Sequence, residues 1–305
     1  MHLAEQLALL TTEAVNDRTR EIDLMSTRDA VGLLHDEDRV VADAVGRELD
    51  PIARAVDLVV EMMNNGGGLI YVGAGTSGRL GILDASEMPP TFGVPPTLVR
   101  GIIAGGRDAV FASIEGAEDD AMAGKQALAQ ELAAGTKAVV CGLSASGRTP
   151  FVLGALEEAS RQGMPTVLVS TNTGDVVRAF APYVDVFICP HVGPEPIAGS
   201  TRMKSGTAQK MVLNMITTAS MVRLGKTFGN VMVDLQLTNE KLRERARRIV
   251  MSLAGVDAAT AGMCIDQAEG NVKTAIVMAR FACTKQEALE RLARAGGIIR
   301  TALTI

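Results

Sequence analysis

The chain has 305 residues, of which 47% are hydrophobic and only 3% aromatic, and its formal net charge at pH 7 is −5. This length accommodates a full α/β core with a smaller second unit. The negative charge, with no basic cluster, argues against binding to nucleic acid. No apolar run approaches membrane-spanning length and no basic, apolar leader opens the chain, so we expect a cytoplasmic protein with no membrane partner.

Soft metal ligands are scattered along the chain. The cysteines form no Cys-x-x-Cys pair, which favours buried free thiols over zinc sites or disulfides: Cys141, Cys189, Cys264 and Cys283. His35 lies beside the acidic residues 36–38, which could hold a metal, but a solvated helix end is the favoured interpretation. We therefore expect neither a metal nor a cofactor.

The first fifty residues are predicted to form loosely connected helices, with a capping-box pattern at Ser26–Asp29. Asp50-Pro51 then predicts a helix start, because Asp caps a helix and Pro suits its first turn. This helix is expected to end at Asn64–Gly68, where glycines lead into a strand.

A strand, a glycine-rich turn and a helix follow one another at Leu69–Val72, Gly73–Gly78 and from Arg79 to just before Pro89. Glycines let the backbone approach a ligand closely, amides at the helix start point outward, and the hydroxyls of Thr76 and Ser77 add donors. We therefore predict that this stretch binds a phosphorylated molecule.

The glycines of this turn also match the dinucleotide fingerprint Gly-x-Gly-x-x-Gly, which is weak evidence by itself. The next strand lacks the acidic residue that a ribose hydroxyl would require. Asp84, Ser86 and Glu87 are instead expected just past the helix, before Pro89-Pro90. A carboxylate beside an anion-binding turn is a candidate acid or base.

A second strand is predicted at Thr97–Ala104, and Arg107–Ser113 is expected to be helical. The acidic run Ile114–Asp120 leads into a longer helix that ends near Gly135. Acidic side chains are common in the first turn of a helix, so spacing alone favours that ordinary role for Glu118 over catalysis.

The third strand, Lys137–Leu143, runs directly into a second turn that carries the hydroxyls of Ser144, Ser146 and Thr149, and a helix follows through Glu158. A helix cap would use one hydroxyl and leave two without a role. Hydroxyls at the carboxyl end of a strand and the start of a helix favour a phosphate site.

Two further strands are predicted at Thr166–Thr171 and Val184–Cys189, with a short helix from about Asp175 between them. Strands that alternate with helices predict an α/β fold with a doubly wound, largely parallel sheet of at least five strands.

The loop at residues 191–196 contains His191, for which an incidental position is favoured over catalysis. Gly199–Lys210, which includes Ser200, then opens a long helix. Arg202 and Lys204 could meet a substrate carboxylate, or they could be ordinary surface cations.

Beyond residue 239 only helices are predicted, at 240–253, 257–266, 272–280 and 285–295, with a capping box at Thr284–Glu287. This small bundle carries no chemical cluster. We expect three parts: an N-terminal helical segment (1–50), a sugar-phosphate-binding α/β domain (51–238) and a C-terminal helical module (239–305).

Five stretches together resemble the N-acetylmuramic acid 6-phosphate etherases, which have the sugar isomerase (SIS) fold: Gly73–Glu87, Glu115–Asp119, Ser144–Thr149, Gly199–Asn214 and Asn271–Met278. The resemblance implies a SIS-type sheet, a homodimer with sites near the subunit interface, and a C-terminal module similar to a ubiquitin-associated domain. It also implies cleavage of a D-lactyl ether to give N-acetylglucosamine 6-phosphate.

The same resemblance implies roles for individual residues. Glu87 would protonate the leaving ether oxygen, and Glu118 would be its partner base. The sugar phosphate would be held by Ser77, Ser144, Ser146 and Thr149, with Thr76, Ser200 and Lys204 as further substrate-binding candidates. Two alternatives stay open: a sugar-phosphate isomerase of the same fold, and a non-enzymatic regulator that senses a sugar phosphate.

Overall fold

The computed structural model describes residues 10–132, 135–235, 237 and 240–304. The chain divides into two compact units. The first comprises Met1–Ser86 and Thr97–Thr217, and the second comprises Glu87–Pro96 and Thr218–Ile305.

The first unit is built on a five-stranded sheet in the order β2-β1-β3-β4-β5, in which every neighbouring pair is parallel. The strands are β1 (Gly68–Gly73), β2 (Val99–Ile103), β3 (Ala138–Leu143), β4 (Thr166–Val169) and β5 (Val186–Ile188). All five predicted strands are present, which confirms the predicted α/β class with a parallel sheet.

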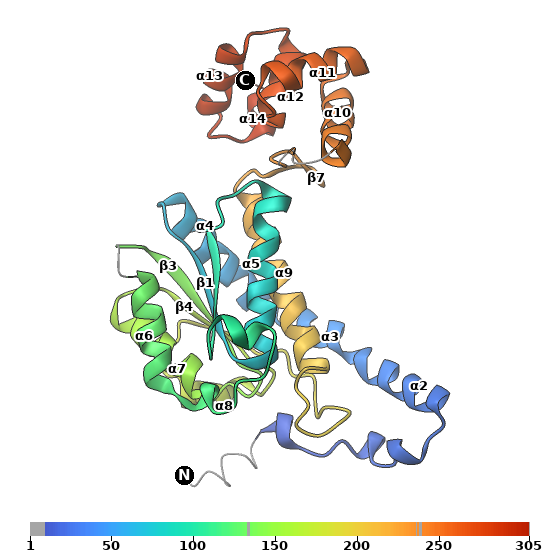
Figure 1. Ribbon diagram of the computed structural model, residues 1–305, viewed down its shortest axis with the longest axis vertical. Coiled ribbons are helices and arrows are strands. Elements are labelled where there is room, and N and C mark those ends of the chain that lie inside the picture. The colour runs from blue at the N-terminus through green and yellow to red at the C-terminus, as the bar shows by residue number, and fades with distance from the viewer. Residues whose placement is uncertain (1–9, 133–134, 236, 238–239, 305) are drawn as a thin grey trace. The chain divides into compact units, whose positions relative to one another are not determined.

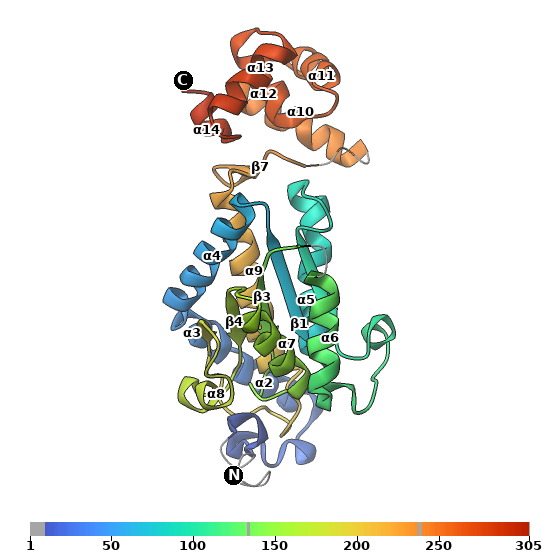
Figure 2. The same ribbon diagram turned by 90° about the vertical axis from the view of Figure 1, so that its left-hand side faces the viewer.

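Helices cover both faces of this sheet (Figures 1 and 2). On one face, α7 (Pro150–Arg161) packs against β1, β3 and β4, and α6 (Ala121–Leu132) packs against α7. On the other face, α4 (Leu49–Asn64) packs against β1, β3 and β5. Both faces are therefore buried, as parallel sheets require.

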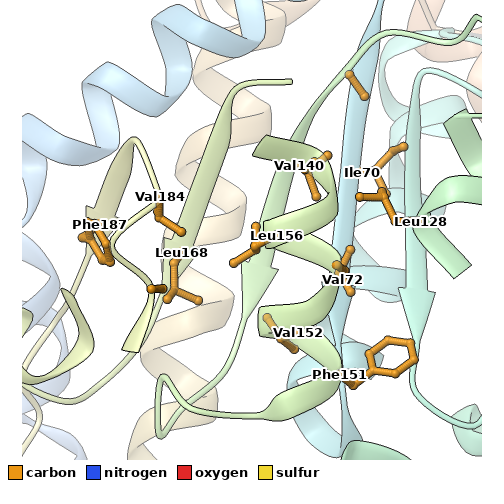
Figure 3. Packing of buried hydrophobic residues seen from close by; sticks show 14 of the residues in the cluster. Ile70, Val72, Leu128, Val140, Phe151, Val152, Leu156, Leu168, Val184 and Phe187 are labelled. Carbon is orange, nitrogen blue, oxygen red and sulfur yellow. The ribbon is translucent and has the colours of Figure 1, made fainter. Parts of the chain in front are cut away.

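The core beneath α7 consists of aliphatic side chains from alternate strand positions, because successive residues of a strand point to opposite faces. Ile70 and Val72 of β1 meet Val152 and Leu156 of α7 in this cluster (Figure 3). All four are fully buried. The cluster is mainly aliphatic and also includes Phe151 and Phe187.

The described part of the N-terminal segment is helical as predicted, whereas residues 1–9 lie outside the described residues. Its helices are η1 (Thr11–Glu13), η2 (Asp17–Thr19), η3 (Ile22–Leu24), α2 (Thr27–Asp38) and α3 (Val40–Gly46). The hydroxyl of Ser26 accepts a hydrogen bond from the amide of Asp29, so the predicted cap starts α2. The first unit also contains η4 (Arg107–Val110), η5 (Ala117–Asp119) and α8 (Gly174–Phe180), and α9 (Lys204–Arg223) begins in it.

Helix α5 (Gly75–Phe92) corrects the prediction at both of its ends. It begins at Gly75 rather than Arg79, and it continues through Pro89 and Pro90. Two internal prolines cost a helix about 3 kcal/mol each, whereas burial of a Met or Phe side chain contributes about 1.5–3 kcal/mol each. Because Met88 and Phe92 are both buried, their burial offsets much of that cost. Glu87 consequently lies within the helix and not beyond it.

The second unit contains a short antiparallel hairpin, β6 (Thr227–Phe228) with β7 (Val231–Met232), which sequence analysis missed because each strand has only two residues. Helices follow: α10 (Glu240–Ala254), α11 (Ala258–Gln267), α12 (Val272–Phe281), α13 (Lys285–Arg294) and α14 (Ile299–Ala302). The capping box predicted at Thr284 is present. The four predicted helices are confirmed, and α14 is an addition.

No single described helix is long and apolar enough to cross a membrane. The pair α10 and α11 reaches that length and hydropathy only jointly, with a bend of 109° between them.

Candidate functional site

The strand order places a topological switch point between the carboxyl ends of β1 and β3. These strands are neighbours, with Gly73 opposite Leu143, but the chain continues from β1 to one edge of the sheet and from β3 to the other. In doubly wound sheets, ligands bind at such a switch point, outside the carboxyl ends of the strands. Both predicted turns, after β1 and after β3, therefore belong to one place in the fold.

The turn after β3 gathers its hydroxyls around Ser144. The Oγ atom of Ser144 lies 2.7 Å from Oγ1 of Thr149 and 3.4 Å from Oγ of Ser146. It also accepts a hydrogen bond from the amide of Gly147 over 3.0 Å. Ser144 is buried, whereas Ser146 and Thr149 are half-buried. The structure therefore brings these three predicted phosphate ligands together.

Two features of this turn favour an anion. Gly147 has a φ of 74°, and a Cβ atom there would lie 2.8 Å from Val177 and 2.9 Å from the Ser170 hydroxyl, so no side chain fits. Thr149 stands at the N-cap of α7 without capping it, because its hydroxyl bonds Ser144. The positive end of α7 thus lacks a side-chain cap next to three hydroxyls.

A polar layer behind the turn was missed by sequence analysis. Asn172 donates hydrogen bonds to the backbone oxygens of Ser146 (3.0 Å) and Ala145 (3.3 Å). The hydroxyls of Ser170 and Thr171 donate to the same Ala145 oxygen, over 3.0 and 3.1 Å. The only sequence signal was three consecutive polar residues at the carboxyl end of a buried strand, which general turn composition also explains.

In the turn after β1, Ser77 lies in the first turn of α5 and is buried. Its hydroxyl donates a hydrogen bond to Oε1 of Gln209, on α9, over 2.8 Å. Thr76 is half-buried beside it. Gln209 had no predicted role, because one polar residue within a helix gives no local signal of a partner 132 residues away.

Glu118 lies in η5 and is exposed, not in the first turn of α6. It lines a cavity of about 160 Å³ together with Gly75 and Arg79 of α5 and with Glu115. Arg79 holds the intervening loop, because its guanidinium donates to the backbone oxygens of Val110 and Ala112, each over 2.9 Å. Glu118 is thus placed at a cavity that includes the glycine-rich turn.

The two carboxylates of α5 that the sequence analysis named, Asp84 and Glu87, have different surroundings. Glu87 is exposed and belongs to the second unit. Asp84 is buried and accepts hydrogen bonds from the Tyr71 and Thr217 hydroxyls, over 3.0 and 3.2 Å. Burial raises the pKa of Asp84 above its ordinary value, although these two hydrogen bonds act in the opposite direction.

At the start of α9, Lys204 is buried and forms an ion pair with Glu37 of α2, with 2.8 Å between Nζ and Oε2. The ordinary-surface-cation interpretation is therefore wrong for Lys204. The buried carboxylate of Glu195 accepts from the amides of Lys204 and Ser205, each over 2.9 Å. The start of α9 is therefore already occupied by an anion. Ser200 is half-buried just before it.

His35 and His191 are both exposed, and only two of the four cysteines have the predicted buried position. His35 is exposed at the end of α2, as a solvated helix end should be, although its neighbour Glu37 turns inward. His191 is exposed, with Nε2 3.1 Å from the Thr11 hydroxyl. The cysteines are free thiols, two of them buried. Within the described ranges, no group of three or more His, Cys, Asp or Glu residues is placed to hold a metal ion.

Comparison with known proteins places these features in context. Residues 51–160 match the family model of the glucokinase regulatory protein N-terminal SIS domain. The chain is 50% identical over 294 residues to the N-acetylmuramic acid 6-phosphate etherase of Geobacillus thermodenitrificans, covering 96% of this chain and 98% of that protein. It is 54% identical over 272 residues to the etherase of Symbiobacterium thermophilum, covering 89% of each. A phosphoheptose isomerase structure from Francisella tularensis is 18% identical and covers 64% of this chain and all of that one, with a TM-score of 0.46.

Proposed function

Because the chain belongs to the family of N-acetylmuramic acid 6-phosphate etherases, we propose that it cleaves the D-lactyl ether of N-acetylmuramic acid 6-phosphate. The products are D-lactate and N-acetylglucosamine 6-phosphate, so the protein is a carbon–oxygen lyase of amino sugar recycling. The names of its relatives indicate the substrate, and the hydroxyl-bearing residues at the switch point are proposed to hold it.

The observation that carries the proposal is the hydroxyl-lined turn at the uncapped start of α7. The hydroxyls of Ser146 and Thr149 both lie within hydrogen-bonding distance of the Ser144 hydroxyl. They stand at the start of α7, which has no side-chain cap and carries the positive end of the helix dipole. A dianionic phosphate uses several such donors at once. This arrangement supports binding of the sugar through its 6-phosphate, with Ser77 and Thr76 contributing from the turn after β1.

The reaction is an elimination followed by a hydration. In the open-chain aldehyde the carbonyl at C1 acidifies the C2 proton, and the ether oxygen on C3 lies β to that carbonyl. Removal of the C2 proton and protonation of the ether oxygen break the C3–O bond, release D-lactate and leave an unsaturated aldehyde. Water then adds its oxygen to C3 and a proton returns to C2.

This chemistry requires one acid and one base, each contributing about 10²–10⁴ in rate. We assign the acid that protonates the leaving oxygen to Glu87 and the partner base to Glu118. The position of Glu118 at the cavity next to Gly75 supports the second assignment. Ser200 completes the proposed substrate contacts. Lys204 is proposed to support them rather than to touch the substrate, because its ammonium group is buried and paired with Glu37.

Isotope labelling tests the mechanism. In ¹⁸O-water the label should enter the C3 hydroxyl of the sugar while D-lactate emerges unlabelled, and in deuterated water C2 should acquire deuterium. Displacement at the lactyl carbon would instead label lactate and leave the C2 hydrogen in place. That second pattern would overturn the mechanism.

The same assay separates the alternatives. A sugar-phosphate isomerase of this fold would exchange the C2 proton without releasing D-lactate, and a sensor would bind the sugar phosphate without turnover.

We also propose that the protein works as a cytoplasmic homodimer and that the helices after residue 239 support this dimer. Light scattering of the full chain and of a chain truncated at residue 239 tests both points.

A further inference from the structure

The buried contact between Ser77 and Gln209 leaves one polar group without a partner. Gln209 is fully buried on α9, and its Oε1 accepts the hydrogen bond from the Ser77 hydroxyl. Its Nε2 has no hydrogen-bond partner among the described residues. An unpaired buried donor costs about 1–3 kcal/mol, and orphaned N–H groups are rarer in folded proteins than under-satisfied carbonyls.

The same contact also commits the only proton of the Ser77 hydroxyl. A serine hydroxyl has one donor and two acceptor positions. With its proton directed at Gln209, Ser77 presents only lone pairs to anything else, and lone pairs repel a phosphate. The Ser77 hydroxyl can donate to a phosphate only if its proton turns away from Gln209.

We propose that the carboxamide of Gln209 is a positioning group that sets the direction of the Ser77 hydroxyl. In the ligand-bound state it is reversed about its terminal bond, so that Nε2 donates to Ser77 Oγ and the hydroxyl proton turns toward a phosphate oxygen. No covalent bond changes. The reversal pairs one of the two N–H groups of Nε2 with Ser77 and leaves the carbonyl oxygen without that partner, and an under-satisfied carbonyl is less costly than an orphaned N–H. This inference rests on the proposed function, because it takes Ser77 to be a phosphate ligand.

Two substitutions of Gln209 by side chains of similar length distinguish a hydrogen-bonding role of its carboxamide from a role in packing alone. Gln209→Glu can only accept when ionised, so it holds the Ser77 proton permanently. Gln209→Met makes no strong hydrogen bond, so it leaves the hydroxyl free to donate. We expect Gln209→Glu to raise KM for the 6-phosphate substrate by about tenfold or more, with kcat less affected, and Gln209→Met to raise it by only a few fold.

Two controls show whether the effect passes through the hydroxyl. In a Ser77→Ala background the KM difference between Glu and Met at position 209 should disappear. Acidification should lower the KM of Gln209→Glu relative to wild type, because a protonated carboxyl can donate to Ser77. Equal KM values for the two variants, a difference that persists without Ser77, or no relief at low pH would each overturn the proposal.

A spectroscopic measurement covers the case in which a buried glutamate prevents folding. In the wild-type chain labelled with ¹⁵N-glutamine, the Gln209 side-chain amide protons, identified by their absence in Gln209→Met, should shift when inorganic phosphate or glucosamine 6-phosphate saturates the site. The shift should be lost in Ser77→Ala. Unchanged resonances at saturation contradict the inference. This arm needs no turnover, so a failure of wild-type D-lactate release would instead count against the proposed function.

Discussion

The side-chain amide of Asn172 donates a hydrogen bond over 3.0 Å to the backbone oxygen of Ser146, in the middle of the proposed phosphate-binding turn. The carbonyl oxygen of the same side chain accepts a hydrogen bond from the amide of Thr11 over 2.7 Å. One residue thus fastens the turn on one side and the N-terminal segment on the other. The described N-terminal segment is therefore linked to the turn through Asn172.

This arrangement predicts that Asn172→Ala and Asn172→Asp both raise KM for the 6-phosphate substrate by about tenfold, with a smaller change in kcat. The Asp variant keeps the oxygen that accepts from the Thr11 amide. It loses the donor and places a negative carboxylate against the backbone oxygens of Ala145 and Ser146, so we expect its KM to be the higher of the two. Steady-state kinetics on folded variants measure both values. A KM for the Asp variant close to that of wild type would show that the turn does not depend on this donor.

The serines of the turn should differ in what they stabilise. Ser146→Ala should raise KM strongly and leave the fold intact, because its half-buried hydroxyl is available to a ligand. Ser144→Ala should also lower the free energy of unfolding by about 1–3 kcal/mol, because the buried Ser144 hydroxyl satisfies the Gly147 amide. Kinetics and urea unfolding distinguish the two effects. Unchanged kinetics for Ser146→Ala, or equal activity on the unphosphorylated sugar, would contradict the proposed phosphate site.

Replacing the proposed acid and base should affect turnover more than binding, because proton transfer is needed mainly in the transition state. We expect Glu87→Gln and Glu118→Gln each to lower kcat by about 10²–10⁴ with KM little changed. Glu115→Gln is the matched control, since Glu115 is also exposed and lines the same cavity as Glu118. The assignment fails if the control loses as much activity as Glu118→Gln, or if both test variants turn over normally.

Arg79 should act on catalysis through the loop that precedes Glu118. Its two hydrogen bonds to the oxygens of Val110 and Ala112 require the forked guanidinium, and lysine can make only one of them. We expect kcat to fall by about tenfold in Arg79→Lys and by up to about 100-fold in Arg79→Met, because misplacement by about 1 Å is costly at a reacting group. If Arg79→Met raised KM alone, the residue would instead be a substrate contact.

The ion pair between Glu37 and Lys204 predicts a pH dependence of stability. Burial alone would raise the pKa of Glu37, but hydrogen bonds from Lys204 and Asn16 and the charges of Lys204 and Arg18 outweigh it, so the pKa is lowered. This stabilisation is therefore present above the unfolded pKa, about 4.3, and is lost as the pH falls through the lower folded value.

Glu37→Gln should lose about 3–5 kcal/mol of unfolding free energy at neutral pH, because Lys204 is left buried and uncompensated. The variant should also be less sensitive than wild type to acidification below about pH 4.3. Urea unfolding across that range measures both effects. Parallel curves for the two proteins, offset or not, would mean that Glu37 does not titrate with folding.

The amino-acid sequence by itself determined the five strands, the two hydroxyl-bearing turns and most of the helices, because apolar runs, glycines and caps act over a few neighbouring residues. The neighbours of Ser144 in the turn at Ser146 and Thr149 were predictable for the same reason. Only the tertiary structure decided that both turns meet at the β1–β3 switch point, since strand order depends on packing between distant segments. It likewise decided that α5 runs through Pro89-Pro90, because burial of Met88 and Phe92 counters the local preference of proline to end a helix. The partners of Ser146, Ser77 and Lys204 lie 26, 132 and 167 residues away in the chain, and no local pattern records a contact over such separations.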